Sequence, residues 1–243
     1  MMENILEFGS KRVKPNVRML FDMKEVICDR EWLAGANNIE LYYMYRELSL
    51  SKNDASVIKE YGLRYDITVI PPRMLGYEYV KTAGHYHPRV LGTDVTYPEI
   101  YEVLSGEAHY LMQKPDNDRI AEVILVKAEQ GDKVIIPPGY GHITINASNR
   151  VLKMANWVAQ DFESTYEPVK EKGGAAYFIL KDGFVKNPAY SDVPEIRILK
   201  PASLKEAGLS KNKEMYGLVR DIRKLEFLVK PQEYGWLFDS MFK

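Results

Sequence analysis

The stretch Gly84-His85-Tyr86-His87-Pro88 carries the strongest structural signal in this chain, because it places two histidines two residues apart. Side chains two apart on an extended strand point to the same side, so His85 and His87 can bind one ion together. Only four of the 243 residues are histidines, which makes this pairing a stronger indication of a metal site than of two unrelated surface side chains.

The segments around this stretch predict an all-β fold. Short runs of β-branched and aromatic residues follow one another, and Gly, Pro, Asn or Asp separates most of them. The runs are 65–70, 77–81, 100–104, 108–113, 121–126, 133–136, 143–147 and 151–158. Short strands with regular turn signals are typical of a sandwich or barrel rather than of a parallel α/β sheet. A double-sheet jelly roll is the closest match.

Weaker patterns flank this region and suggest three parts. The first part, 1–62, is expected to pack on the barrel, 63–186 to form the barrel with the metal site, and 187–243 to be a C-terminal extension. The flanking segments predict short helices at 22–28, 54–61 and 204–207, strands at 38–45, 195–199 and 224–229, and a hairpin at 175–185 that turns at Asp182-Gly183.

Composition narrows the class of protein. Hydrophobic residues make up 46% of the chain, enough for a substantial core, and 33 basic residues nearly balance 34 acidic ones. No global field would therefore attract nucleic acid or an anionic membrane. The single Cys28 excludes an intrachain disulfide and fits a reducing compartment. The first residues lack the pattern of a secretory signal, and no apolar run reaches the roughly 18 residues of a membrane helix. We expect a cytoplasmic protein.

Two further residues complete a ligand set with the histidine pair. Glu99 lies in Tyr97-Pro98-Glu99-Ile100-Tyr101, and His142 closes the turn Pro137-Pro138-Gly139-Tyr140-Gly141-His142. A carboxylate and a third imidazole from neighbouring strands would give three nitrogens and one oxygen. This set suits a first-row divalent metal and leaves room for substrate oxygens.

Other polar residues compete for this role. Asp94 lies in a connection between strands and could replace Glu99 if the loop folded inward, and Glu107 is a further carboxylate. Glu102 is three positions from Glu99, so the two should not both face the metal. The fourth histidine, His109, fits no ligand spacing and is interpreted as a structural or surface residue.

Three motifs together resemble those of a known superfamily. They are Gly-His-Tyr-His at 84–87, Pro-Glu-Ile-Tyr-Glu-Val-Leu-Ser-Gly at 98–106, and Ile-Pro-Pro-Gly-Tyr-Gly-His at 136–142. They are similar to the metal-binding motifs of the cupin superfamily, whose fold is a double-stranded β-helix. The lead-in Thr82-Ala83-Gly84 and the pair Glu99-x-Tyr101 narrow the resemblance to archaeal-type cupin phosphoglucose isomerases. It covers about 15–180.

The resemblance implies roles for individual residues. His85, His87, Glu99 and His142 would bind one divalent metal ion, which could be Fe, Zn, Mn, Ni or Co. Thr68, Thr82 and Gly84 would bind the sugar phosphate, since hydroxyls and backbone N–H groups can hold a phosphate without a basic patch. Tyr101 would reach the substrate. Independently of the resemblance, Tyr101, Tyr140 or Tyr166 could assist ring opening by donating to the ring oxygen of the sugar. The resemblance also implies a homodimer that binds a small sugar phosphate. From the composition we expect neither nucleic acid nor membrane as a partner.

The chain departs from the family pattern in several places. The connection from His87 to Glu99 is longer, and Gly139 stands where the family has a tyrosine. A tyrosine and a histidine that contact substrate in the family fall on Trp157 and near Ser164. The final sixty or so residues have no counterpart.

The implied reaction is the interconversion of glucose 6-phosphate and fructose 6-phosphate. A divalent metal would polarise the substrate carbonyl, and Glu99, as both ligand and base, could carry the proton between C1 and C2. A hydride shift would need no base, and the sequence does not choose between the two. The alternative to an isomerase is another metal-dependent cupin, either an oxygenase or a non-catalytic sugar-binding protein.

Overall fold

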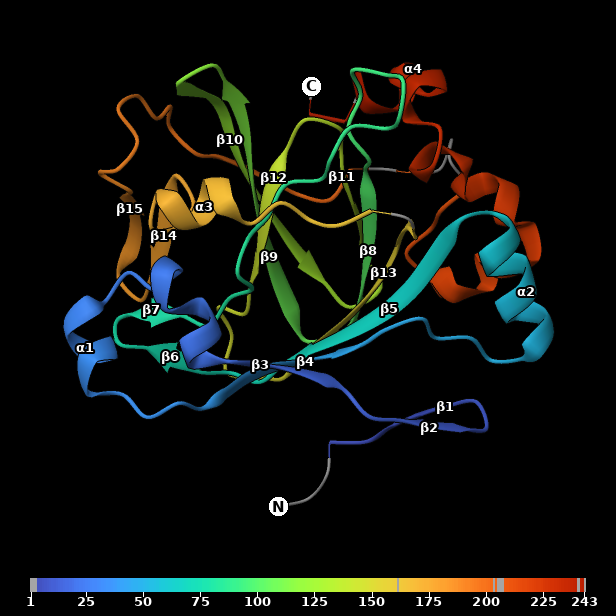
Figure 1. The fold of residues 1–243 in the computed structure, drawn as a ribbon, viewed down its shortest axis with the longest axis horizontal. Helices are drawn as coiled ribbons and strands as arrows, with labels where there is room; N and C mark the ends of the chain where they lie inside the picture. Colours follow the sequence, from blue (N-terminus) through green and yellow to red (C-terminus); the bar gives the residue numbers. More distant parts are fainter. Residues whose placement is uncertain (1–3, 161, 203, 205–207, 240, 243) are drawn as a thin grey trace.

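The computed structural model describes residues 4–160, 162–202, 204, 208–239 and 241–242 (Figure 1). Two sheets pack against each other and form the barrel. The larger sheet has the strand order β11-β8-β13-β5-β4-β3 and the smaller one β12-β9-β10-β16. All neighbouring strands are antiparallel except β10 and β16. The predicted all-β, double-sheet architecture is confirmed.

The strands of the larger sheet are β11 (Lys133–Ile136), β8 (Glu99–Ser105), β13 (Leu152–Ala159), β5 (Leu63–Ile70), β4 (Glu40–Tyr45) and β3 (Asn16–Met19). Those of the smaller sheet are β12 (Gly141–Ile145), β9 (Glu107–Asp116), β10 (Arg119–Glu129) and β16 (Arg197–Leu199). The remaining strands form a hairpin, β1 (Leu6–Phe8) with β2 (Lys11–Val13), and a sheet of β15 (Gly183–Lys186), β14 (Tyr177–Leu180), β7 (Glu78–Tyr79) and β6 (Met74–Leu75).

Short helices cover the barrel. They are η1 (Leu20–Val26), α1 (Arg30–Gly35), α2 (Lys52–Glu60), α3 (Glu167–Glu171), η2 (Met215–Leu228), η3 (Pro231–Glu233) and α4 (Gly235–Asp239). The helices expected near 22–28 and 54–61, the strand near 38–45 and the hairpin at 175–185 all lie close to their predicted positions. The strand predicted at 77–81 is reduced to β7, and residues 205–207 of the helix predicted at 204–207 lie outside the described residues. No described helix is both long and apolar enough to cross a membrane.

The two faces of the larger sheet are buried in different ways. Alternate side chains along each strand point to opposite faces. On β13, Met154 belongs to the core between the sheets, whereas Trp157 belongs to a second core on the outer face. That outer core includes η2, α2 and Phe8 of β1, and Figure 1 shows the C-terminal segment beside β5 and α2. The C-terminal segment therefore covers the outer face of the barrel.

The prediction of a strand at 224–229 is wrong, because residues 224–228 lie in the 3-10 helix η2. Leu225 and Phe227 alternate with charged residues and imitate a strand. The helix is interrupted at Asp221, and after this kink the pattern has a period of three, since Ile222, Leu225 and Leu228 are all buried. Side chains three apart lie above one another on a 3-10 helix, so this spacing forms one apolar stripe against the sheet.

A buried ion pair of the barrel, which also contacts this extension, supports a stability prediction. Lys133 Nζ lies 2.9 Å from Glu102 Oε1, with both side chains almost fully buried. Glu102 also accepts a hydrogen bond of 2.6 Å from the backbone N–H of Met215. Lys133→Met would leave the carboxylate buried without its cation, so we expect the free energy of unfolding to fall by about 3–5 kcal/mol, measured by urea denaturation.

The control for this experiment is Lys211→Met. Lys211 pairs with Glu129 and Asp132, but its side chain is 47% exposed. An exposed pair contributes about 0–1 kcal/mol. Equal losses in the two variants would contradict a stabilising role for the Lys133–Glu102 pair.

Candidate metal centre

Four candidate ligands come from three separate segments of the chain. Glu99 is the first residue of β8, and His142 lies in β12. His85 and His87 lie in the connection between β7 and β8, where the backbone of His85 pairs with that of His142 through two hydrogen bonds of 3.0 and 3.2 Å. This bridge attaches the histidine pair to the edge of the smaller sheet, beside the end of β8.

The structure brings all four side chains together. One ligand atom from each of His85, His87, Glu99 and His142 lies within 4.8 Å of the others. Nε2 of His85 is 3.1 Å from Nε2 of His87, and Glu99 Oε2 is 3.5 Å from His87 Nε2 and 3.2 Å from His142 Nε2. Two atoms that each lie about 2.1 Å from a shared ion are roughly 3–4 Å apart. The cluster therefore fits a single divalent metal.

The ionisation of these groups favours metal binding. Burial, followed by the nearby His142 and His87, lowers the pKa of His85 well below its usual value, and burial lowers the pKa of His87 to about 4. Burial alone would raise the pKa of Glu99, but its contacts with His142 and His87 outweigh burial and lower it. The imidazoles of His85 and His87 are thus neutral and Glu99 is a carboxylate, as metal ligands must be.

A neighbouring carbonyl orients the imidazole of His87. His87 Nδ1 lies 2.9 Å from the Tyr97 carbonyl oxygen and donates to it, which directs the lone pair of Nε2 toward the cluster. The Tyr101 hydroxyl lies 3.2 Å from His142 Nε2. Phe162 packs on His87 with ring centroids 4.6 Å apart and stacks on Tyr97. This aromatic stack covers one side of the cluster.

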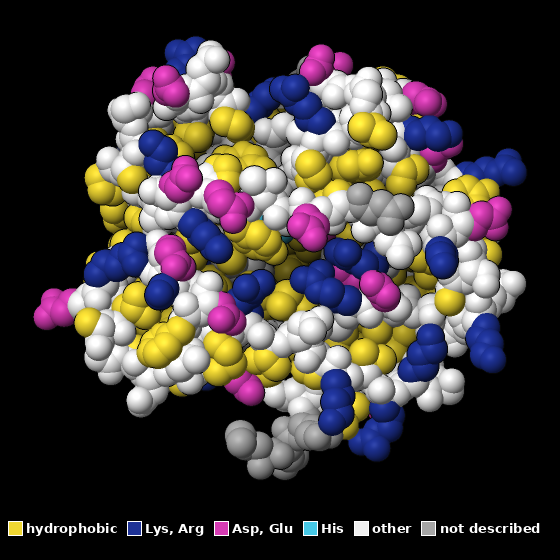
Figure 2. All heavy atoms as spheres, viewed as in Figure 1, with side chains coloured by type: hydrophobic (Ala, Val, Ile, Leu, Met, Phe, Trp, Pro, Cys, Tyr) yellow, Lys and Arg dark blue, Asp and Glu magenta, His cyan; other side chains and the backbone are white. Residues whose placement is uncertain are grey.

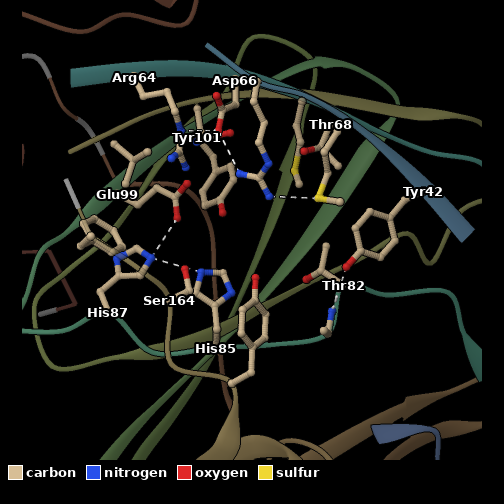
Figure 3. A pocket seen from close by; sticks show the side chains of 18 residues that line it. Tyr42, Arg64, Asp66, Thr68, Thr82, His85, His87, Glu99, Tyr101 and Ser164 are labelled. Carbon is tan, nitrogen blue, oxygen red and sulfur yellow. Dashed lines mark hydrogen bonds and ion pairs between the residues drawn. The ribbon is translucent and has the colours of Figure 1, made fainter. Parts of the chain in front are cut away.

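A cavity extends from the cluster into the barrel (Figure 3). Of the residues predicted to bind substrate, Thr68, Thr82, Tyr101 and Tyr166 line it. Gly84, also predicted to bind substrate, is not among the residues that line the cavity. Its φ of +79° and the distance of 2.5 Å from a Cβ there to Ile143 Cγ1 both favour glycine at this position. Figure 2 shows a hollow near the centre of one face with Lys and Arg side chains at its border.

The structure does not bring Tyr140 together with these residues. Its hydroxyl donates a hydrogen bond to Glu122, and its ring packs against Phe242 with centroids 5.7 Å apart. The side chain belongs to a separate surface depression formed in part by Arg197 and α4. The Gly-Tyr-Gly turn directs the hydroxyl toward the C-terminal segment, away from the cavity.

The competing residues lie outside the cluster. The Asp94 side chain is 94% exposed and pairs with Arg89, and Glu107 pairs with Arg150 at the surface. Glu102 faces the outer core, on the opposite face of the sheet from Glu99, as the alternation along a strand predicts. His109 lies on β9, outside the cluster, and its Nδ1 is buried without a partner among the described residues.

Sequence reasoning missed several cavity residues. Arg46, Arg64, Asp66 and Asn156 line the cavity together with Tyr42. A signal was available, because Arg64 and Asp66 lie four and two positions before Thr68 and must share its face on β5. Two positions where the family has substrate-contacting residues can also be located. Ser164 lines the cavity. Trp157 lies in the outer core, on the other face of the sheet, and donates from Nε1 to the Met215 carbonyl at 3.1 Å.

A double-sheet barrel that holds three histidines and a glutamate at the mouth of its cavity defines a cupin. A family model described as glucose-6-phosphate isomerase (GPI) matches residues 17–195. The chain therefore belongs to the glucose-6-phosphate isomerase family of enzymes, in its cupin form.

Curated relatives of the same family are similar to this chain. Glucose-6-phosphate isomerase of Thermococcus litoralis is 28% identical over 72% of this chain and 85% of the relative. The enzyme of the same name from Thermococcus gammatolerans is 29% identical over 75% and 89%. Among solved structures, an oxalate oxidase in complex with the substrate analogue glycolate overlaps with a TM-score of 0.35 and 19% identity, over 44% of this chain and 47% of that chain.

Proposed function

We propose that this protein is a metal-dependent isomerase that interconverts glucose 6-phosphate and fructose 6-phosphate. The observation that carries the proposal is that one cavity is lined by Thr68, Thr82 and residues of the four-ligand cluster. An aldose–ketose isomerase must hold the C1–C2 end of the sugar at the reacting groups and the phosphate at a distance from them. Membership of the glucose-6-phosphate isomerase family supports the same substrate.

The residues of the cluster have separate tasks in this proposal. A divalent ion held by His85, His87, Glu99 and His142 would polarise the substrate carbonyl. Glu99 carries the proton: its carboxylate removes a proton from C2 of glucose 6-phosphate and returns it to C1, while the hydroxyl proton on O2 moves to O1. Oε2 of Glu99 faces the histidines, and we assign the other carboxylate oxygen to the proton. Phe162 and Tyr97 exclude water from the side of His87.

A coupled assay tests the proposal. Purified protein is supplied with fructose 6-phosphate, and glucose 6-phosphate formation is followed before chelation, after chelation, and after each of Fe, Zn, Mn, Ni and Co is added back. We expect turnover that disappears with the chelator and returns with at least one ion. Folded protein without turnover on any of these metals would contradict the isomerase and favour an oxygenase or a non-catalytic sugar-binding cupin.

Thr68 offers a clean test of substrate binding. Its side chain is buried in the cavity wall and makes no hydrogen bond to another described residue, whereas Thr82 Oγ1 already accepts from the Thr144 N–H at 3.0 Å. Thr68→Val keeps the shape and removes one donor to an anionic group, a hydrogen bond of about 1.5–3 kcal/mol. We expect KM for fructose 6-phosphate to rise at least about tenfold with metal content unchanged. Thr68→Ser is the control, and an unchanged KM in Thr68→Val would reject the role.

The proposal includes a homodimer. Residues of the C-terminal segment, among them Met215, Val219 and Leu225, cover the outer face of the larger sheet. That face is therefore occupied within the chain itself. Pairing of two barrels would use a different surface.

A further inference from the structure

Two arginines line the cavity beside the metal cluster and share one carboxylate. Arg64 Nε donates to Asp66 Oδ2 at 2.8 Å, and Arg46 Nη1 lies 3.4 Å from the same oxygen. Asp66 is buried, while the Arg46 and Arg64 side chains are 38% and 21% exposed. Two guanidinium groups thus face a single carboxylate, which leaves one positive charge without a counterion on this wall.

The strand register places this group between the metal cluster and the threonines. Tyr101 on β8 is opposite Asn156 on β13, and Asn156 is opposite Asp66 on β5. Asp66 forms an ion pair with Arg46, the residue directly after β4. One row of polar side chains therefore runs from β8 across β13 and β5 to the end of β4. Met44 is opposite Thr68, which puts Arg46 diagonal to Thr68, within reach of a long side chain. Figure 3 shows Arg64, Asp66 and Thr68 along one wall, facing His85 and His87.

The backbone is shaped to hold Arg46 in this position. Glu47, directly after it, has a φ of +57°, a left-handed conformation that is uncommon for a residue other than glycine. Its N–H donates to Asp66 Oδ1 at 2.9 Å. Asp66 therefore anchors both the turn after Arg46 and the Arg46 guanidinium. The guanidinium keeps donors for a ligand, since among described residues its contacts are Asp66 and the Met44 sulfur.

A sugar phosphate brings a negative charge that a cation in the cavity would stabilise beyond the hydrogen bonds of the threonines. A phosphate monoester carries about −1.5 to −2 at pH 7. Hydroxyl groups can donate hydrogen bonds to a phosphate, and donors that carry a positive charge make shorter and stronger ones. Of the described residues that line the cavity, the cationic ones are Arg46 and Arg64.

We propose that Arg46, held by Asp66 and supported by the charge of Arg64, binds the phosphate group together with Thr68 and selects phosphorylated over unphosphorylated sugars. The selection between phosphorylated and unphosphorylated sugars rests on the proposed isomerase function, whereas the binding of phosphate does not. The ligand class is a phosphate monoester, recognised by one guanidinium and one hydroxyl from neighbouring strands.

The test compares Arg46→Gln, Arg46→Lys and the control Arg89→Gln. Arg89 is an exposed arginine paired with Asp94 on the loop that follows His87. We expect Arg46→Gln to raise KM for fructose 6-phosphate at least about tenfold, with kcat changed less than about threefold. Its bound metal and its turnover of unphosphorylated fructose should match wild type. Arg46→Lys should recover part of the loss, and Arg89→Gln should behave as wild type.

A second measurement is independent of turnover. Inorganic phosphate is titrated into metal-loaded protein and its binding is followed by calorimetry, with an expected loss of at least about tenfold in affinity in Arg46→Gln. Unchanged phosphate affinity, or an equal loss of fructose and fructose 6-phosphate turnover, would overturn the inference and leave Arg46 a structural residue. Wild-type protein that binds phosphate through Arg46 but does not isomerise fructose 6-phosphate would support the inference and reject only the isomerase.

Discussion

His87→Ala should lose bound metal and isomerase activity together while the barrel stays folded. The imidazole supplies one of four ligand atoms, and its Nδ1 is held by the Tyr97 carbonyl. Removing a group that only orients a ligand already lowers metal affinity about 10–100-fold. Loss of the ligand itself should therefore cost at least about 100-fold in affinity and reduce turnover to background. Metal content is measured by mass spectrometry and activity by the coupled assay.

His109→Ala is the matched control for this variant. His109 is the one histidine of the chain that lies outside the cluster, on β9. It should keep its metal and its turnover, and circular dichroism should show the same β-sheet content in both variants. Retained metal with full turnover in His87→Ala would reject the ligand assignment.

Glu99→Gln should reduce kcat at least about 100-fold, because a positioned acid–base group contributes about 10²–10⁴ in rate. The substitution keeps the shape of the side chain and removes both the negative charge and the base. Glu99 is buried and its pKa is lowered, so the wild-type group is ionised at neutral pH. Rates are measured at matched metal occupancy, since the loss of charge also weakens metal binding.

Isotope exchange separates the two possible mechanisms. In D₂O, wild-type enzyme should incorporate deuterium at C1 of fructose 6-phosphate during turnover, because a carboxylic acid exchanges its proton with water. A product without deuterium, together with a Glu99→Gln variant that retains most of its kcat, would favour a hydride shift. That result would leave Glu99 as a ligand alone.

Local rules account for the parts of the fold that could be predicted. The runs between residues 65 and 158 contain β-branched and aromatic residues and end at turn formers, so they become strands wherever the chain packs them. The apolar residues near 225 failed as a predictor, because their period of two coexists with a period of three. Contact with the outer face of the sheet selected the 3-10 helix.

The residues of the site also divide into those that the sequence could predict and those that it could not. His85, His87, Glu99 and His142 could be grouped from motif and resemblance, and the structure places them together. Tyr140 lies in a similar motif, yet its hydroxyl binds Glu122 outside the cavity. A turn can direct a side chain into the cavity or away from it, and the sequence motif does not indicate which of the two occurs.

By itself, the sequence determined the all-β class, the short strands and the set of candidate metal ligands. These depend on residue type and on spacing along the chain, which fixes the face of a strand. Only the tertiary structure brings Arg46 to Arg64 and Asp66 beside the metal cluster and places the C-terminal segment on the outer face of the larger sheet. Both depend on strand register and on packing between distant segments, such as those of Tyr216 and Asp54, which are 162 residues apart and which no local pattern connects.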